Sequence, residues 1–214
     1  MLRKSYANQV TILSASLQWN EGRWVWLLGI LATGAVLLGL GDNTLMALRY
    51  DRAAIGAGQW WRLWTAHAVH ADFHHYALNA LGVVLVWALF AREFRALQWI
   101  VIVALSALGI SLGLLRFDPS LQWYVGASGV LHAVMAAGCV KRMHDRQWDR
   151  WILAVFLAGK LAMEQFSQTR GAITFSGSTP IIVDAHLFGA LAGAVIAAAL
   201  MAGMAIIRVD SQEP

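Results

Sequence analysis

Two residue types that act together in acyl transfer, a serine and a histidine, stand in unusual local settings in this sequence. The serine is Ser128, within Gly126-Ala127-Ser128-Gly129, where the glycines permit a tight turn and a close approach of other backbone. A serine at a helix start also leaves backbone N–H groups free, and these can stabilise an oxyanion. Taken alone, a motif of this kind more often marks a helix N-cap or close packing of small residues.

His186 is the candidate base for this serine. Gly189 and Gly193 follow it, and they form a stripe of small residues on which another helix can approach closely. If the helix of Ser128 packs there, the imidazole comes near the hydroxyl, and a serine beside a histidine base is a sufficient nucleophile. For His186 considered alone, a buried histidine that donates to a backbone carbonyl is an equal alternative.

His75 and Asn79 are candidate side-chain donors to an oxyanion. They are four residues apart, so they share one face of a helix, and each can donate a hydrogen bond. Together with the backbone N–H of Ser128 they would form an oxyanion hole. A polar contact that joins two helices explains the pair equally well.

Several histidines near Asp72 raise the question of a metal site. They are His67, His70, His74 and His75. Their spacing fits no standard ligand set, and no cysteine supports them, because the single cysteine, Cys139, lies in an apolar stretch. We therefore expect neither a metal nor another cofactor.

Three further polar residues belong to the same constellation. His132 lies one turn after Ser128, and an i,i+4 pair directs both side chains the same way, so we expect His132 to line the site and not to act as base. Asp184 and Glu164 are candidates for orienting His186. Asp184 is only two residues from His186, and we expect its side chain to diverge. These residues favour a Ser–His dyad over a triad.

The composition places the helices that must position these residues in a membrane. Of the 214 residues, 59% are hydrophobic and only 13% charged, and the mean hydropathy is +0.58. A soluble domain of this size needs a larger charged surface. Although the net charge is +4, the basic residues lie between apolar runs and form no patch, so nucleic acid is not an expected partner.

The apolar runs predict an all-α, polytopic membrane protein with a six-helix bundle. A bilayer needs about 20 apolar residues per helix, and the candidate spans are 24–40, 75–91, 97–115, 127–141, 149–163 and 185–207. We expect a short N-terminal segment at 1–23, a membrane domain at 24–207 and a tail at 208–214. The connection from Gly41 to His74 contains Trp60, Trp61 and Trp64 and is expected to lie at the membrane interface.

The charges in the connections predict the orientation. With the N-terminus in the cytoplasm, ten Lys and Arg residues are cytoplasmic and six are external, which agrees with the positive-inside rule. Both termini are then cytoplasmic. The second, fourth and sixth helices all run inward, and each carries its polar residues near its outer end, at similar depth.

The ordered set of motifs resembles the rhomboid family of intramembrane proteases. The matching segments are Trp61-Arg62-Leu63-Trp64-Thr65, His70, His75, Asn79, Gly126-Ala127-Ser128-Gly129, and Ala185-His186 followed by Gly189 and Gly193. The resemblance covers roughly residues 24–207. Each motif is weak alone, but the set in this order is specific.

The resemblance implies a role for each matched residue. Ser128 would be the nucleophile and His186 the base, with an oxyanion hole formed by the Ser128 backbone, His75 and Asn79. His70 would be a supporting residue near the entrance. The matched glycines would be supporting residues as well; they are Gly126, Gly129, Gly189 and Gly193.

One residue departs from the family pattern. Many rhomboids carry a tyrosine that stacks against the catalytic histidine, at the position where this chain has His132. We count His132 among the supporting residues, and an imidazole there would change the basicity or the orientation of His186.

A narrower resemblance is to rhombosortases, a compact rhomboid branch of some Gram-negative bacteria. The segments that carry it are 128–132, 160–165 and 183–189. It implies an enzyme of the inner membrane whose site faces the periplasm, and which cleaves the C-terminal Gly-Gly and transmembrane tail of exported proteins. Its partners would be membrane lipid and these tails. The alternatives are a general rhomboid protease that cuts single-span membrane proteins, and a non-catalytic rhomboid-like protein that binds transmembrane segments.

Overall fold

Long helices make up most of the chain in the computed structural model, which describes residues 23–146, 150–166 and 181–210. The long helices are α2 (Arg23–Gly39), α6 (Phe73–Phe90), α7 (Ala96–Phe117), α8 (Ser128–His144), α9 (Arg150–Phe166) and α10 (Val183–Asp210). Each of them coincides with one predicted span to within a few residues. The predicted all-α class is therefore confirmed. Residues 1–22 of the predicted N-terminal segment 1–23 lie outside the described residues, as do residues 211–214 of the predicted tail 208–214, whereas residues 208–210 belong to α10.

Three of these helices, α6, α7 and α10, are long and apolar enough to cross a membrane by themselves. A fourth crossing is reached if α2 and α3 (Asp42–Leu48) count as one span, since they pass the same test together across a bend of 114°. Helices α8 and α9 have 17 residues each, which is short for a bilayer core. The chain is thus a multi-pass membrane protein, and the number six stays a prediction.

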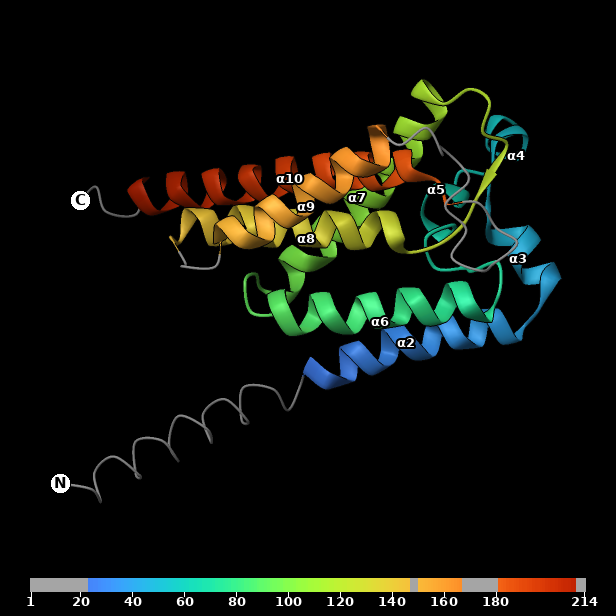
Figure 1. The fold of residues 1–214 in the computed structure, drawn as a ribbon, viewed down its shortest axis with the longest axis horizontal. Helices are drawn as coiled ribbons and strands as arrows, with labels where there is room; N and C mark the ends of the chain where they lie inside the picture. Colours follow the sequence, from blue (N-terminus) through green and yellow to red (C-terminus); the bar gives the residue numbers. More distant parts are fainter. Residues whose placement is uncertain (1–22, 147–149, 167–180, 211–214) are drawn as a thin grey trace, which may run out of the picture.

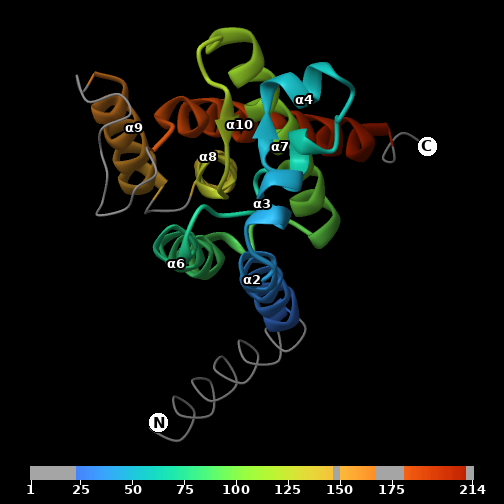
Figure 2. The same ribbon diagram turned by 90° about the vertical axis from the view of Figure 1, so that its right-hand side faces the viewer.

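Helix α8 is the centre of the bundle. It contacts α6, α7, α9 and α10, which surround it in an end-on view (Figure 2). Its inner residues are small, including Ala133, Ala137 and Gly138. This shelter explains how a helix with polar residues is kept from lipid, where unsatisfied polar groups are costly.

Helices α8 and α10 approach each other closely along the small-residue stripe. A Cβ atom added to Gly189 would lie 2.0 Å from the carbonyl oxygen of Gly129, and one added to Gly193 would lie 2.1 Å from that of Ala133. The two backbones therefore touch over two turns, and only glycine permits this contact. The predicted packing of the Ser128 helix on the stripe is observed.

The connection between α2 and α6 forms a cap at one end of the bundle. It contains α3, β1 (Tyr50–Asp51), α4 (Arg52–Gly56) and α5 (Arg62–Thr65). Strand β1 pairs antiparallel with β2 (Trp123–Tyr124), just before α8, with Tyr50 opposite Tyr124. Helices α6, α8 and α10 all begin at this end, while α2 begins and α10 ends at the other (Figure 1). Because these three helices begin at the same end of the bundle, the polar residues in their first turns lie at similar depth, as predicted.

Arg52 attaches the cap to the bundle, and Arg62 joins segments within the cap. The guanidinium of Arg52 donates to the carbonyl oxygens of Leu114, Leu115, Asp118 and Leu121, over 2.6–3.0 Å, at the C-terminal end of α7. Arg62 is buried and donates to Met46, Arg49 and Gln59 within the cap. The last carbonyls of a helix lack partners within the helix, and Arg52 supplies partners at the end of α7. These hydrogen bonds hold the cap in place relative to α7.

Candidate active site

Ser128 stands at the first position of α8, after a turn that only glycine can make. Gly126 has φ +114°, and its N–H donates to the carbonyl of Ala66 over 3.0 Å. Its own carbonyl accepts from the hydroxyl of Tyr124 over 2.8 Å. A Cβ at Gly126 would lie 2.6 Å from the ring of His75. The turn is therefore held from both sides and brings the α6 histidine against the start of α8.

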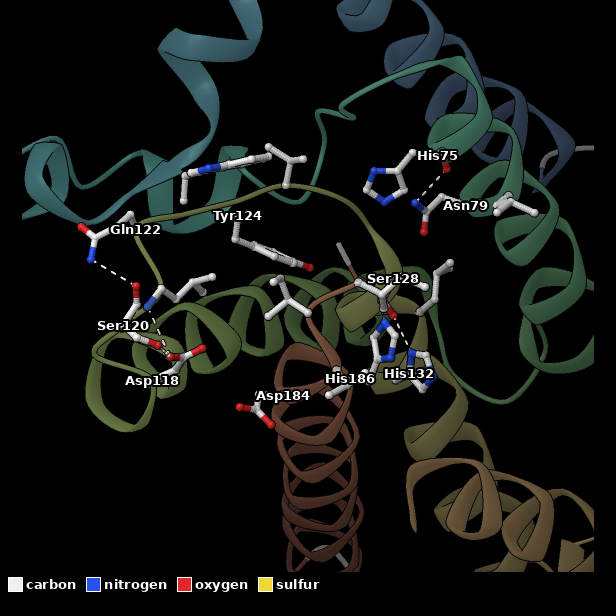
Figure 3. Close-up of a pocket in the computed structure, with 18 of the residues that line it drawn as sticks. His75, Asn79, Asp118, Ser120, Gln122, Tyr124, Ser128, His132, Asp184 and His186 are labelled. Carbon is white, nitrogen blue, oxygen red and sulfur yellow. Dashed lines mark hydrogen bonds between the residues drawn. The ribbon is translucent and has the colours of Figure 1, made fainter. Parts of the chain in front are cut away.

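The serine hydroxyl meets the base predicted for it. The Oγ of Ser128 and the Nε2 of His186 are 2.9 Å apart, and His186 is 5% exposed in the first turn of α10. Figure 3 shows the two side chains directed at each other across the α8–α10 contact. At this distance the hydroxyl donates to Nε2 whenever the imidazole carries its proton on Nδ1.

The other nitrogen of His186 faces a carboxylate. Both oxygens of Glu164, on α9, lie 3.0–3.1 Å from Nδ1, and Lys160, one turn earlier, forms an ion pair with Glu164. Asp184, the other candidate, points away from the Ser128–His186 pair (Figure 3). Ser128, His186 and Glu164 thus form a continuous hydrogen-bonded chain, whereas the sequence favoured a dyad.

His132 lies flat against His186. The two rings are stacked, with centroids 4.1 Å apart and planes inclined by 15°. The Nδ1 of His132 donates to the carbonyl oxygen of Ser128 over 2.7 Å, since a carbonyl can only accept. His132 is therefore a lining residue that limits the rotation of the His186 ring, and no hydrogen bond joins it to the Ser128 hydroxyl.

The predicted oxyanion donors lie beside Gly126, on α6. The amide nitrogen of Asn79 donates to the carbonyl of His75 over 3.0 Å, and the same nitrogen lies 3.7 Å from the Cβ position of Gly126. In Figure 3 both side chains face the start of α8. His70 is buried behind them, with its ring edge-on to that of His75 at 5.3 Å and to that of Tyr76 at 5.4 Å.

These groups line a cavity of about 1070 Å³. Its wall includes Ser128, His132 and His186 together with His75 and Asn79. Residues 117–125 close it on the side of the cap, and Leu78, Leu131 and Val183 add apolar surface. The cavity is large enough for several residues of an extended peptide, and its mixed lining suits both a peptide backbone and apolar side chains.

In the part of the chain that the structure describes, the four histidines that invited a metal interpretation do not form a group of three possible ligands. His67 packs against the ring of Tyr124 and bonds through Nε2 to the Ala107 carbonyl and the Ser111 hydroxyl, both at 3.1 Å, while His74 is exposed. Among the described residues a different group, His132, Glu164 and His186, offers three ligand atoms within 4.8 Å of one another. The ammonium of Lys160 beside Glu164 opposes a second cation there.

The sequence favours a Ser–His dyad and offers Glu164 only as one of two candidates for orienting His186, although its local pattern carries a stronger signal. A carboxylate within a membrane helix is costly unless it is paired and is by default a functional candidate. The pair of Glu164 with Lys160, four residues earlier on the same helix, is the sequence signal that indicates such a role.

One of the comparisons with known proteins identifies a family. The family model of the Rhomboid domain matches residues 57–203 of the chain, which is more than half of its 214 residues. Comparison with the curated proteins gives no match. The matched range contains the cap from Ala57 onward and helices α5 to α9, and it ends within α10.

Proposed function

The chain belongs to the rhomboid family of intramembrane serine proteases, and we propose that it is an endopeptidase with Ser128 as nucleophile and His186 as general base. One observation carries the proposal. The Ser128 hydroxyl and the His186 imidazole are 2.9 Å apart and both line a cavity of about 1070 Å³, so a peptide carbonyl in that cavity can reach the hydroxyl oxygen.

The reaction follows from the positions of the two groups. The Oγ of Ser128 attacks the scissile carbonyl carbon while its proton passes to the Nε2 of His186. The oxygen of the tetrahedral intermediate is stabilised by the Ser128 backbone N–H, His75 and Asn79. His186 then protonates the leaving amine, the C–N bond breaks, and a water molecule hydrolyses the acyl-enzyme by the same proton transfers in reverse.

The substrates we propose are exported proteins with a C-terminal Gly-Gly and transmembrane tail, as for the rhombosortases. Support comes from the resemblance of segments 128–132, 160–165 and 183–189 to that branch. An extended Gly-Gly segment suits the site because glycine allows a carbonyl close access to the start of α8. Such a tail would approach through membrane lipid, beside the helices.

We propose the bacterial inner membrane as the location, with both termini in the cytoplasm and the site towards the periplasm. The count of ten cytoplasmic against six external basic residues supports this orientation. The exposed Trp60, Trp61 and Trp64 support the placement of the cap at a membrane–water interface, because tryptophan is enriched there.

Co-expression with a Gly-Gly-tailed exported protein tests the proposal. The native enzyme should release a product with one defined C-terminal cut, and Ser128→Ala and His186→Ala should release none while they still accumulate in the membrane. A single-span membrane protein without the Gly-Gly tail serves as the matched substrate. Equal cleavage of both would favour a general rhomboid protease, and an identical product mass from all three enzymes would refute the catalytic assignment.

A further inference from the structure

His186 contacts the carboxylate of Glu164 as well as the hydroxyl of Ser128. Its Nδ1 lies between the two oxygens of Glu164, at 3.0 and 3.1 Å. The side chains are 6% and 13% exposed for His186 and Glu164, so the contact is largely excluded from solvent. It joins α9 to α10 at the point where α10 also meets Ser128 of α8.

We propose that Glu164 is a positioning residue that completes a Ser–His–Glu triad with Ser128 and His186, an inference that rests on the proposed function. An ionised carboxylate can only accept, so it requires the proton of a neutral imidazole to be on Nδ1. The lone pair of Nε2 then faces the Ser128 hydroxyl, and the carboxylate stabilises the imidazolium formed when the proton arrives. Glu164 itself takes no proton.

Lys160 belongs to the same group of interacting side chains as Glu164 and His186. Its ammonium pairs with Glu164 from one turn away, and this offsets the cost of a carboxylate at this depth. A cation there also opposes charge on His186. Among the described residues, the ionisable groups that face His186 are His75 from α6, His132 from α8, and Glu164 and Lys160 from α9. Asp184, on the same helix as His186, points away from it (Figure 3).

Glu164 and Lys160 carry opposite charges, so neutralising each of them should have opposite effects on the protonation of His186. A residue with a purely structural role would not show this effect. Neutralising Glu164 removes a group that favours the imidazolium, whereas neutralising Lys160 removes one that disfavours it. The acid limb of the pH–rate profile should therefore move to lower pH in Glu164→Gln and to higher pH in Lys160→Met. A residue that only joined two helices would lower the rate and leave the limb in place.

The reactivity of Ser128 can be measured with a fluorophosphonate probe, which requires no knowledge of the substrate. The Oγ of Ser128 forms a bond to phosphorus, the P–F bond breaks with loss of fluoride, and His186 takes the hydroxyl proton. The labelling rate of the full chain in detergent micelles is followed from pH 5 to 9 (about four units, spanning the histidine range). We compare native enzyme with Glu164→Gln, Glu164→Asp and Lys160→Met.

We expect Glu164→Gln to label about 10²- to 10⁴-fold more slowly, with its acid limb about one pH unit lower. Glu164→Asp should recover part of the rate. Asp184→Asn is the matched control, since it removes a carboxylate two residues from His186 whose side chain points elsewhere (Figure 3), and it should label like the native enzyme.

Equal labelling and an unmoved limb in Glu164→Gln would overturn the triad while native labelling still supported the protease. If Glu164→Gln does not fold, as judged by thermal unfolding, the limb of Lys160→Met decides, and a limb that stays in place overturns the proposal. Native enzyme that labels no faster than Ser128→Ala would refute the proposed function, and the triad with it.

Discussion

Replacing Gly189 by alanine should separate the proposed catalytic pair, Ser128 and His186, without altering either side chain. The added Cβ would lie 2.0 Å from the Gly129 carbonyl oxygen, whereas an ordinary contact begins near 3.4 Å, so α8 and α10 must move apart by about 1.4 Å there. Ser128 precedes Gly129 directly, and His186 lies one turn before Gly189. The 2.9 Å between Oγ and Nε2 would then grow to about 4 Å, beyond hydrogen-bond range.

The expected loss is larger in rate than in stability. Overpacking of this kind costs about 1–3 kcal/mol of unfolding free energy, which a helical membrane protein can tolerate. A displacement of about 1 Å in a catalytic group can lower the rate by about 100-fold. We therefore expect Gly189→Ala to accumulate in the membrane and to label about 100-fold more slowly with a fluorophosphonate.

The assay pairs the labelling rate with the thermal unfolding midpoint in the same detergent. Gly203→Ala is the control, because it makes the same change in the same helix at a position where a Cβ meets nothing within 4 Å. It should label like the native enzyme. Native labelling by Gly189→Ala would refute the reasoning, since it would mean that the close α8–α10 contact does not set the position of the pair.

Two further predictions concern stability. Burial lowers the pKa of His67 and of His70, which lie between α5 and α6, to about 4. Because unfolding returns each to an ordinary pKa near 6.5, the unfolding free energy should be highest above pH 6.5 and fall towards pH 4, by about 1.4 kcal/mol per pH unit for each. Thermal unfolding across this range should show a smaller slope in His70→Phe, and an unchanged slope in exposed His74→Gln; an equal slope in His70→Phe would contradict the assignment. Arg52→Lys should lower the unfolding free energy by about 1–3 kcal/mol, because an ammonium cannot reach all four carbonyls that the planar guanidinium serves. Thermal unfolding measures this, with exposed Arg116→Lys as the control, and equal midpoints for both variants would show that the cap is held by other contacts.

The positions of the helices and the proximity of Ser128 and His186 can be predicted from the sequence. An apolar run of about 20 residues has few alternatives to a membrane helix, so the helix positions are correct to within a few residues. The glycines at 189 and 193 predicted a close helix contact, and that contact brings His186 to Ser128 at 2.9 Å. Such features depend on local spacing, which one sequence displays directly.

The partners of the polar residues, in contrast, depend on how the helices pack. Glu164 and His186 are 22 residues apart on different helices, and nothing in the spacing says that α9 turns its carboxylate towards α10. The same holds for Arg52, whose partners are more than 60 residues away, and for His70, which lies behind His75 because of how the cap folds. Helix periodicity tells which face a residue occupies, but the rotation and the neighbour of that face are decided by the packing of the whole bundle.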